Sequence, residues 1–270
     1  MKIHRTVLIL PLLAAFLFAE DQAAPTAPPK PKADAKPKPA KFDEASKKLF
    51  DSWRKLEYRW EGVKQATCKI AGTLSMMGQQ MTTKGSYVYD GKSSTLTYDP
   101  GQAGAMLAQQ GWNKDAFDGH WKDGWQEMVA GGTFTATKTD AGTTVKVTGD
   151  TKGKTQAVYF DKAGMLVKMD FLAGGGAQTM KASYEPRYKK LDSGKYIVAG
   201  WTVKADVPGM GLYVEKTELS YAVVGKRHVT TKAISTAEMG GQPMGETKRI
   251  TFDWKFGEKT EAAAPSNSDK

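Results

Sequence analysis

Residues 196–224 read YIVAGWTVKADVPGMGLYVEKTELSYAVV, and this stretch decides the fold class. Apolar and polar side chains alternate with a period of two on both sides of Gly209-Met210-Gly211. A period of two is typical of a β-strand with one buried face and one solvated face. Two such segments, 196–207 and 212–224, are joined by a short glycine-containing turn and therefore predict an antiparallel hairpin.

The same alternation continues on both sides of this hairpin. Turn-forming segments such as Asp140-Ala141-Gly142 and Asp192-Ser193-Gly194 separate the alternating runs. Further strands are predicted over residues 67–76, 81–89, 96–98, 133–138, 143–148, 156–160, 165–171, 178–184, 228–237 and 247–256. About twelve strands exceed what a flat open sheet accommodates, so we expect a sheet that curls strongly or closes. The length from residue 42 to residue 258 suits a single β-rich domain.

Helical periodicity is found in three segments, one before the first predicted strand and two between strands. Asp43 is a good N-cap for a helix that extends to about Glu61. Its apolar positions recur every three or four residues on one face, namely Ala45, Leu49, Trp53, Leu56 and Trp60. Residues 101–110 predict a short helix, and Asn113 begins another that extends to about Ala130. The face of that last helix carries Phe117, Trp121, Trp125 and Met128. Two interpretations stay open: these are ordinary core-facing helices, or they cover an apolar cavity.

The N-terminus has the pattern of a secretory signal peptide. Lys2, His4 and Arg5 precede an almost wholly apolar run over residues 7–19. That run is shorter than the roughly 20 residues that a membrane-spanning helix needs, so we expect cleavage after residue 19 and export to the periplasm or the cell exterior. An uncleaved anchor is the alternative.

Two flanking segments have compositions that cannot form a core. Residues 20–41 are rich in proline, lysine and alanine and predict a disordered linker, and residues 259–270 predict a disordered tail. The linker is interpreted either as a plain disordered leader or as a tether to an anionic envelope surface. After the signal peptide, no segment is long and apolar enough to predict a transmembrane helix.

Composition excludes several classes of function. Cys68 is the single cysteine, so the chain forms no internal disulfide, and its alternation with Ile70 and Leu74 predicts a buried thiol. The net charge of +10 comes from 39 basic and 29 acidic residues that are interleaved along the chain. Nucleic-acid binding usually requires a dense basic stripe or stacking aromatics between the charges. We therefore predict no nucleic-acid partner.

No catalytic, metal or cofactor motif stands out. His120 and His228 lack a second histidine or cysteine at ligand spacing, which argues against zinc, and no Gly-x-Ser-x-Gly elbow occurs. Residues 149–155 (GDTKGKT) are similar to a phosphate-binding loop, but a strand pattern follows where a helix is needed. His120 with Asp123 is interpreted as a surface ion pair. We therefore predict a protein that is not an enzyme and holds no metal or cofactor.

Two short motifs carry a resemblance to a known family. They are Lys84-Gly85-Ser86-Tyr87-Val88-Tyr89 in an early strand and VYFDKAGML over residues 158–166. With the order of helix, strands, helical insert and further strands, residues 43–257 resemble the periplasmic lipoprotein carriers of the outer-membrane lipoprotein-sorting family. The resemblance implies a mostly β fold of the α+β type: a strongly curved, incompletely closed antiparallel sheet, or half-barrel, whose concave face is covered by helices. Its members carry acyl chains.

This chain departs from that family in its long leader and in having three strands before the insert. The family's functional arginine has no match here, so no site residue is carried over.

The leading hypothesis is an exported, soluble protein that binds or carries an acyl chain or a similar apolar ligand. Methionine and tryptophan side chains adapt to varied apolar groups. The candidate lining residues are Trp53, Trp60, Met76, Trp112, Phe117, Trp121, Trp125 and Met128. The alternative is a structural or scaffolding envelope protein, tethered by its basic leader and filled by its own side chains. An enzyme ranks third.

Overall fold

A computed structural model describes residues 39–76, 78–120, 130–149, 151, 154–173 and 179–257. Within these ranges the chain forms thirteen strands in one sheet, in the order β1-β5-β6-β7-β8-β9-β10-β11-β12-β13-β2-β3-β4. Neighbouring strands are antiparallel except for β1 and β5, which are parallel. The strands at the two edges, β1 and β4, do not pair with each other, so the sheet is not closed. The predicted signal peptide, the linker up to residue 38 and the predicted tail lie outside the described residues.

The strands and helices have the following bounds. The strands are β1 (Lys41–Phe42), β2 (Gln65–Met76), β3 (Gln79–Tyr89), β4 (Ser94–Tyr98), β5 (Thr133–Thr139), β6 (Gly142–Thr148), β7 (Thr155–Asp161), β8 (Leu166–Ala173), β9 (Met180–Lys190), β10 (Tyr196–Val207), β11 (Gly211–Val224), β12 (Arg227–Met239) and β13 (Gln242–Gly257). The helices are α2 (Glu44–Leu56), α3 (Gln102–Gln109) and α4 (Lys114–Asp118).

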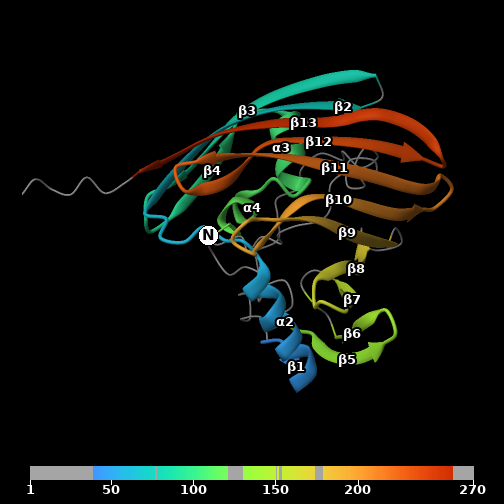
Figure 1. The fold of residues 1–270 in the computed structure, drawn as a ribbon. Coiled ribbons are helices and arrows are strands. Elements are labelled where there is room, and N and C mark those ends of the chain that lie inside the picture. Colours follow the sequence, from blue (N-terminus) through green and yellow to red (C-terminus); the bar gives the residue numbers. More distant parts are fainter. Residues whose placement is uncertain are drawn as a thin grey trace, which may run out of the picture.

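The predicted fold class is confirmed: the chain is mostly β, with a strongly curved and incompletely closed antiparallel sheet (Figure 1). The predicted strands all form, and β10 has the predicted bounds. Strand β13 begins five residues earlier than predicted, at Gln242, because it continues to pair with β12 through two register shifts. Residues 242–245 are exposed on both faces, so alternation gave no signal there. Strand β1 was not predicted, because two residues are too few to show a period.

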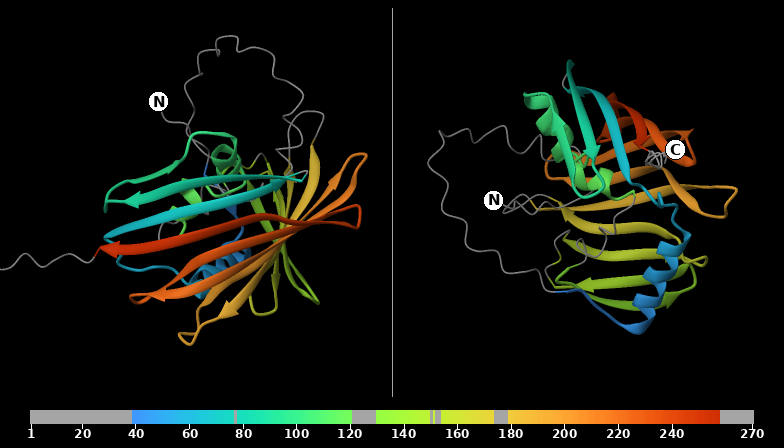
Figure 2. Two further views of the ribbon diagram at one scale, coloured as in Figure 1. Left: turned by 90° about the horizontal axis from the view of Figure 1, so that it is seen from above. Right: turned by 90° about the vertical axis from the view of Figure 1, so that its left-hand side faces the viewer.

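One face of the sheet is buried continuously across the strands. Residues directly opposite each other on neighbouring strands share a face, and one such row runs through Val145, Val158, Met169, Tyr184, Val203, Glu215 and Ala237. In Figure 2, α2 lies against the β5–β8 part of the sheet, and α3 and α4 lie within the curve formed by β2–β4 and β11–β13. The helices therefore cover the concave face, as predicted.

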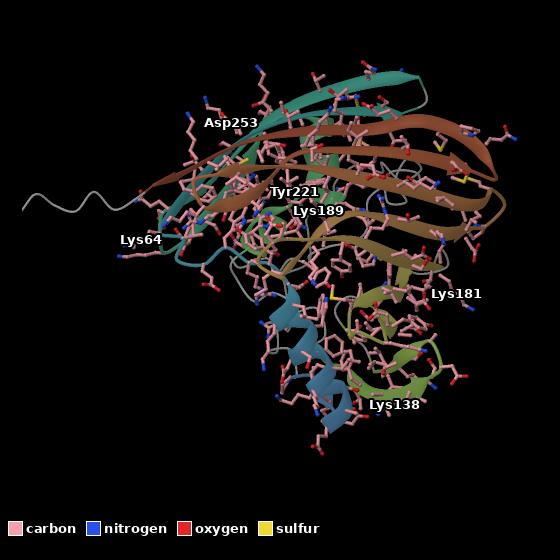
Figure 3. All side chains as sticks on the ribbon, in the orientation of Figure 1. Lys64, Lys138, Lys181, Lys189, Tyr221 and Asp253 are labelled. Carbon is pink, nitrogen blue, oxygen red and sulfur yellow. The ribbon has the colours of Figure 1, made fainter. Side chains whose placement is uncertain are left out.

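Lysine side chains lie on the outside of the molecule. Lys64, Lys138 and Lys181 are exposed (Figure 3).

Helix α2 begins as predicted but ends earlier. The Asp43 carboxylate accepts a 2.7 Å hydrogen bond from Ser46 N and a 2.9 Å bond from Ala136 N, which ties the helix start to β5. The helix ends at Leu56 instead of Glu61, because the next residues turn extended and Tyr58 N donates to the Tyr196 carbonyl at 2.8 Å.

The predicted apolar stripe of α2 is confirmed in part, because Leu49 and Trp53 pack against the core beside Phe50. Ala45 is exposed, and the buried residues are Ser46 and Phe50. Phe50 lies between Phe134 and Phe160, with ring centroids 5.8 and 5.2 Å away. Three aromatic rings in edge-to-face contact bury more apolar surface than an alanine face would, so packing with the sheet selects this side of the helix.

Helix α3 approaches the sheet closely at a glycine. A Cβ atom on Gly72 in β2 would lie 2.6 Å from Cδ1 of Leu107, whose side chain is fully buried. Helix α4 starts as predicted, because the Asn113 side chain accepts from Asp115 N and Ala116 N at 3.1 and 3.2 Å. It ends at Asp118 with Gly119 as its C-cap, well before the predicted end. Residues 121–129 lie outside the described part of the chain.

Candidate ligand-binding cavity

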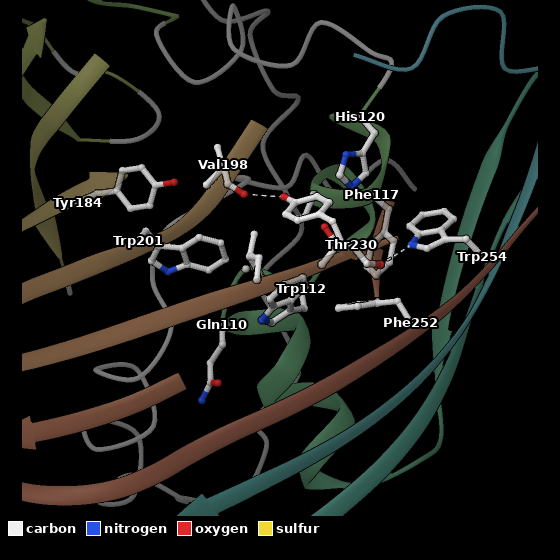
Figure 4. A pocket seen from close by; sticks show the side chains of 14 residues that line it. Gln110, Trp112, Phe117, His120, Tyr184, Val198, Trp201, Thr230, Phe252 and Trp254 are labelled. Carbon is white, nitrogen blue, oxygen red and sulfur yellow. Dashed lines mark hydrogen bonds between the residues drawn. The ribbon is translucent and has the colours of Figure 1, made fainter. Parts of the chain in front are cut away.

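An apolar cavity of about 180 Å³ lies between the α3–α4 segment and strands β9 to β13 (Figure 4). The helical segment and the strands each contribute one wall. Its lining consists of Gln110, Gly111, Trp112, Ala116, Phe117, His120, Tyr184, Val198, Trp201, Leu219, Tyr221, Thr230, Phe252 and Trp254.

A β-bulge in β10 aims two side chains into this cavity. Val198 and Trp201 are three positions apart, so regular alternation would place them on opposite faces. The register between β9 and β10 shifts between Val198 and Gly200, which inserts one extra residue and brings both side chains to the concave face. A Cβ on Gly200 would lie 2.3 Å from the Thr217 carbonyl oxygen, so the bulge requires glycine at this position.

Aromatic rings form most of the cavity wall. The ring of Trp112 lies 5.1 Å from that of Phe252 and 6.1 Å from that of Trp201, measured between centroids. At the other end of the cavity the ring of Phe117 lies 5.8 Å from that of Trp254. Offset and tilted pairs at these distances are favourable arrangements for aromatic side chains. The cavity therefore has preformed, apolar walls.

The polar tips of two lining residues are satisfied within the wall. The Tyr221 hydroxyl donates to the Val198 carbonyl at 2.6 Å, and Trp254 Nε1 donates to the Thr230 carbonyl at 3.1 Å. Burial raises the pKa of the Tyr184 and Tyr221 phenols, so both stay neutral over the physiological range. Their rings therefore act as apolar surface.

His120 closes the wall at the end of the α4 segment. Its imidazole stacks on the Trp60 indole with centroids 4.3 Å apart and an angle of 12° between the planes. Trp60 is itself held by two hydrogen bonds, from its backbone N to the His120 carbonyl at 2.9 Å and from Nε1 to the His228 carbonyl at 2.8 Å. Desolvation lowers the pKa of His120 to about 4, so the imidazole is neutral at neutral pH. The predicted ion pair of His120 with Asp123 stays a prediction, because Asp123 lies outside the described residues.

Helix α4 is anchored to the sheet by a buried carboxylate. Asp118 accepts hydrogen bonds from the Tyr87 hydroxyl at 2.6 Å, from the Ser94 hydroxyl at 2.8 Å and from Lys114 Nζ at 2.8 Å. The Tyr87 ring also stacks on Phe117, with centroids 5.1 Å apart. These contacts position the helical wall of the cavity against β3 and β4.

A buried ion pair lies elsewhere on the same face of the sheet. Lys248 Nζ is 3.4 Å from Glu215 Oε1, and the two side chains are 2% and 0% exposed. The Tyr213 hydroxyl donates to the other carboxylate oxygen at 3.0 Å. Burial lowers the pKa of Lys248, while the adjacent Glu215 opposes that effect. Neither charged residue lines the cavity.

The structure places two of the predicted lining residues, Trp112 and Phe117, in the cavity wall. Trp53, a residue of α2, lies instead beside Phe160, and Trp60 stacks on His120 from behind the wall. The backbone of Met76 pairs with Gln79 at the end of β2, and its side chain is outside the description. Trp121, Trp125 and Met128 also lie outside the described residues.

Sequence reasoning missed the strand residues of the wall, because aromatic residues were sought on the helices. The missed strand residues are Tyr184, Val198, Trp201, Leu219, Tyr221, Thr230, Phe252 and Trp254. Ile250, which is fully buried, Phe252 and Trp254 are every second residue of β13 and therefore lie on the same face. The alternation in this strand could thus have predicted that Phe252 and Trp254 face the interior.

Other features bear on chemistry and location. Cys68 is a free, buried thiol, as predicted, and burial raises its pKa to about 12. Within the described ranges, no three or more His, Cys, Asp or Glu side chains gather at a distance suited to a metal ion. In that same part of the chain, no helix is long and apolar enough to cross a membrane.

Comparison with known proteins gives weak likenesses only. No protein-family model matches the chain, and no curated protein matches it significantly by sequence. Among solved structures, an outer membrane lipoprotein-sorting protein domain from Vibrio parahaemolyticus is similar over 80% of this chain and 93% of its own, with 9% identity and a TM-score of 0.28. A DUF1329 family protein from Desulfovibrio piger is similar over 77% of this chain and 90% of its own, with 10% identity and a TM-score of 0.27.

The resemblance to lipoprotein-sorting proteins stated from the sequence is thus matched by a weak structural likeness to a protein of that description. At these identities and TM-scores, neither likeness bears on what this chain binds.

Proposed function

We propose that this chain is an exported binding protein that holds an acyl chain or a similar apolar group in the aromatic cavity. The single observation that carries the proposal is the cavity of about 180 Å³ between an unclosed sheet and the α3–α4 segment. The role proposed is binding without catalysis. The signal-peptide pattern of residues 1–19 supports export to the periplasm or the cell exterior.

The volume of the cavity limits the group that it accepts. An apolar cavity of about 150 Å³ binds benzene, whereas pockets for drug-sized ligands are about 300–1,000 Å³. A cavity of 180 Å³ therefore accepts a single ring or a short stretch of acyl chain. The remainder of a longer ligand must lie outside the cavity.

Burial of the ligand's acyl chain supplies the binding affinity. Each methylene that leaves water contributes about 0.8 kcal/mol, so six buried methylenes contribute about 5 kcal/mol before the entropic cost of association. Aromatic walls that are already packed against one another lose little freedom when the ligand enters. Such a site needs no charged or nucleophilic group to bind its ligand.

A cavity-filling variant tests this proposal. Val198→Phe places a larger side chain in the wall, and Val223→Phe makes the same change at a position that is 61% exposed. In a titration with a fluorescent acyl probe, the parent and Val223→Phe should bind alike, and Val198→Phe should bind at least about tenfold more weakly. Equal binding by all three proteins, or no binding by the parent, would instead favour a scaffold with a filled interior.

A further inference from the structure

Gln110 brings an unpaired amide to the wall of the apolar cavity. The residue is 5% exposed, and neither Nε2 nor Oε1 has a hydrogen-bond partner among the described residues. Its backbone N–H donates to the Met106 carbonyl at 2.8 Å, which fixes the residue at the end of α3. A buried donor and a buried acceptor without partners are costly, and in native proteins each such group calls for an explanation, such as a functional role or a bound water.

Two indole rings of the wall also carry N–H groups. Trp112 and Trp201 both line the cavity, with ring centroids 6.1 Å apart. In Figure 4 the nitrogen of each indole lies on the ring edge that faces the Gln110 side, while His120 lies at the opposite end. The backbone of Trp112 is fixed, because its carbonyl accepts from the Tyr98 hydroxyl at 2.7 Å. The cavity therefore has a polar end with several donors and one acceptor.

The polar end carries no formal charge. The described lining contains no lysine, arginine, aspartate or glutamate. An anion moved from water into this site would lose its hydration without gaining a counter-charge. The site therefore favours a neutral polar group over a carboxylate.

We propose that the cavity recognises the neutral amide group at the head of an acyl chain. The carbonyl of the ligand accepts from Gln110 Nε2 and from an indole N–H, and its amide N–H donates to Gln110 Oε1. An ester lacks that N–H and leaves Oε1 unpaired, and a hydrocarbon leaves all of these groups unpaired. The acyl chain of the ligand then extends from Gln110 toward Phe117 and His120. This inference rests on the proposed function and specifies its ligand.

The test compares, by calorimetry at neutral pH, three ligands that share the same eight-carbon acyl chain. Octanamide offers a donor and an acceptor, methyl octanoate an acceptor alone, and octanoate a negative charge. We expect octanamide to bind the parent protein about tenfold more tightly than methyl octanoate, because one or two net hydrogen bonds contribute about that factor. We expect octanoate to bind most weakly of the three. Gln110→Met, which keeps the length of the side chain, should abolish the preference for the amide.

A matched control is available at the adjacent position. Gln109 is exposed, so Gln109→Met makes the same chemical change away from the cavity and should leave the preference intact. Equal affinity for amide and ester in the parent, or a preference that survives Gln110→Met, would overturn the inference and leave the proposed function standing. Failure of all three ligands to bind would overturn both. Gln110→Met should also unfold at an equal or higher denaturant concentration, because it removes two unpaired polar atoms.

Discussion

The Tyr87 hydroxyl in β3 donates a 2.6 Å hydrogen bond to Oδ1 of Asp118 at the end of α4, and both side chains are buried. This bond joins the helical wall of the cavity to the sheet. The Asp118 carboxylate also accepts hydrogen bonds from the Ser94 hydroxyl and from Lys114 Nζ. Because one carboxylate collects these bonds, the position of the wall depends strongly on a residue that does not itself line the cavity.

Asp118→Ala should therefore loosen the cavity as well as destabilise the protein. It leaves the Tyr87 hydroxyl without its buried acceptor, and bonds to charged groups contribute about 1.5–3 kcal/mol each. We expect a loss of about 2–3 kcal/mol in urea denaturation and a faster dissociation of bound ligand in stopped-flow measurements. Asp118→Asn keeps an oxygen acceptor and should show a smaller effect on both. Unchanged dissociation in Asp118→Ala would show that α4 is held by other contacts.

The buried pair of Glu215 and Lys248 predicts non-additive mutations. Removing either partner leaves an uncompensated buried charge, which costs about 3–5 kcal/mol. Glu215→Leu and Lys248→Met should each destabilise by that amount in chemical denaturation, whereas the double variant should recover most of the loss. The exposed pair of Lys216 and Glu238, 3.6 Å apart, serves as the control, and Lys216→Met should change stability by less than about 1 kcal/mol. Strictly additive losses in the buried pair would contradict this account.

His120 predicts a loss of stability at acid pH. Its pKa in the folded protein is lowered from 6.5 to about 4, so the unfolded chain binds more protons between these values. The neutral imidazole of His120 therefore makes its full contribution to the free energy of unfolding above pH 6.5. This contribution falls by about 3 kcal/mol as the pH drops to about 4. His120→Phe keeps a ring against Trp60 and removes the titration. The difference in unfolding free energy between the two proteins should therefore vary with pH over this window, and a difference that stays constant would refute the role of His120.

The sequence predicted the sheet well, because alternation survives wherever a strand has one buried face. Residues 196–207 show this pattern over a full strand, and the same holds for Cys68, Ile70 and Leu74 in β2, which are all buried. The face of α2 was predicted only in part, through Leu49 and Trp53. Ser46 is buried and Ala45 is exposed, because three aromatic rings contributed by α2 and the sheet decide the rotation of the helix.

The cavity was only partly predictable, because it depends on long-range contacts and on irregular backbone. The bulge beside Gly200 brings Val198 and Trp201 to one face, and strict alternation assigns them to opposite faces. The polarity of Gln110 is visible in the sequence, but its burial depends on the packing of α3 inside the curve of the sheet. Trp112 was found from its residue type, and Phe117 from its residue type together with its place on the predicted helix face.

Crystals of the protein with 8-bromooctanamide test the central claim most directly, because anomalous scattering locates the bromine at the end of the chain. If the cavity holds the acyl chain with its amide at Gln110, the bromine peak lies at or beyond the end of the cavity formed by Phe117 and Trp254, and the amide lies within hydrogen-bond distance of the Gln110 side chain. A bromine peak on the outer face of the sheet, or an empty cavity at saturating ligand, would contradict the claim that this cavity binds an acyl chain.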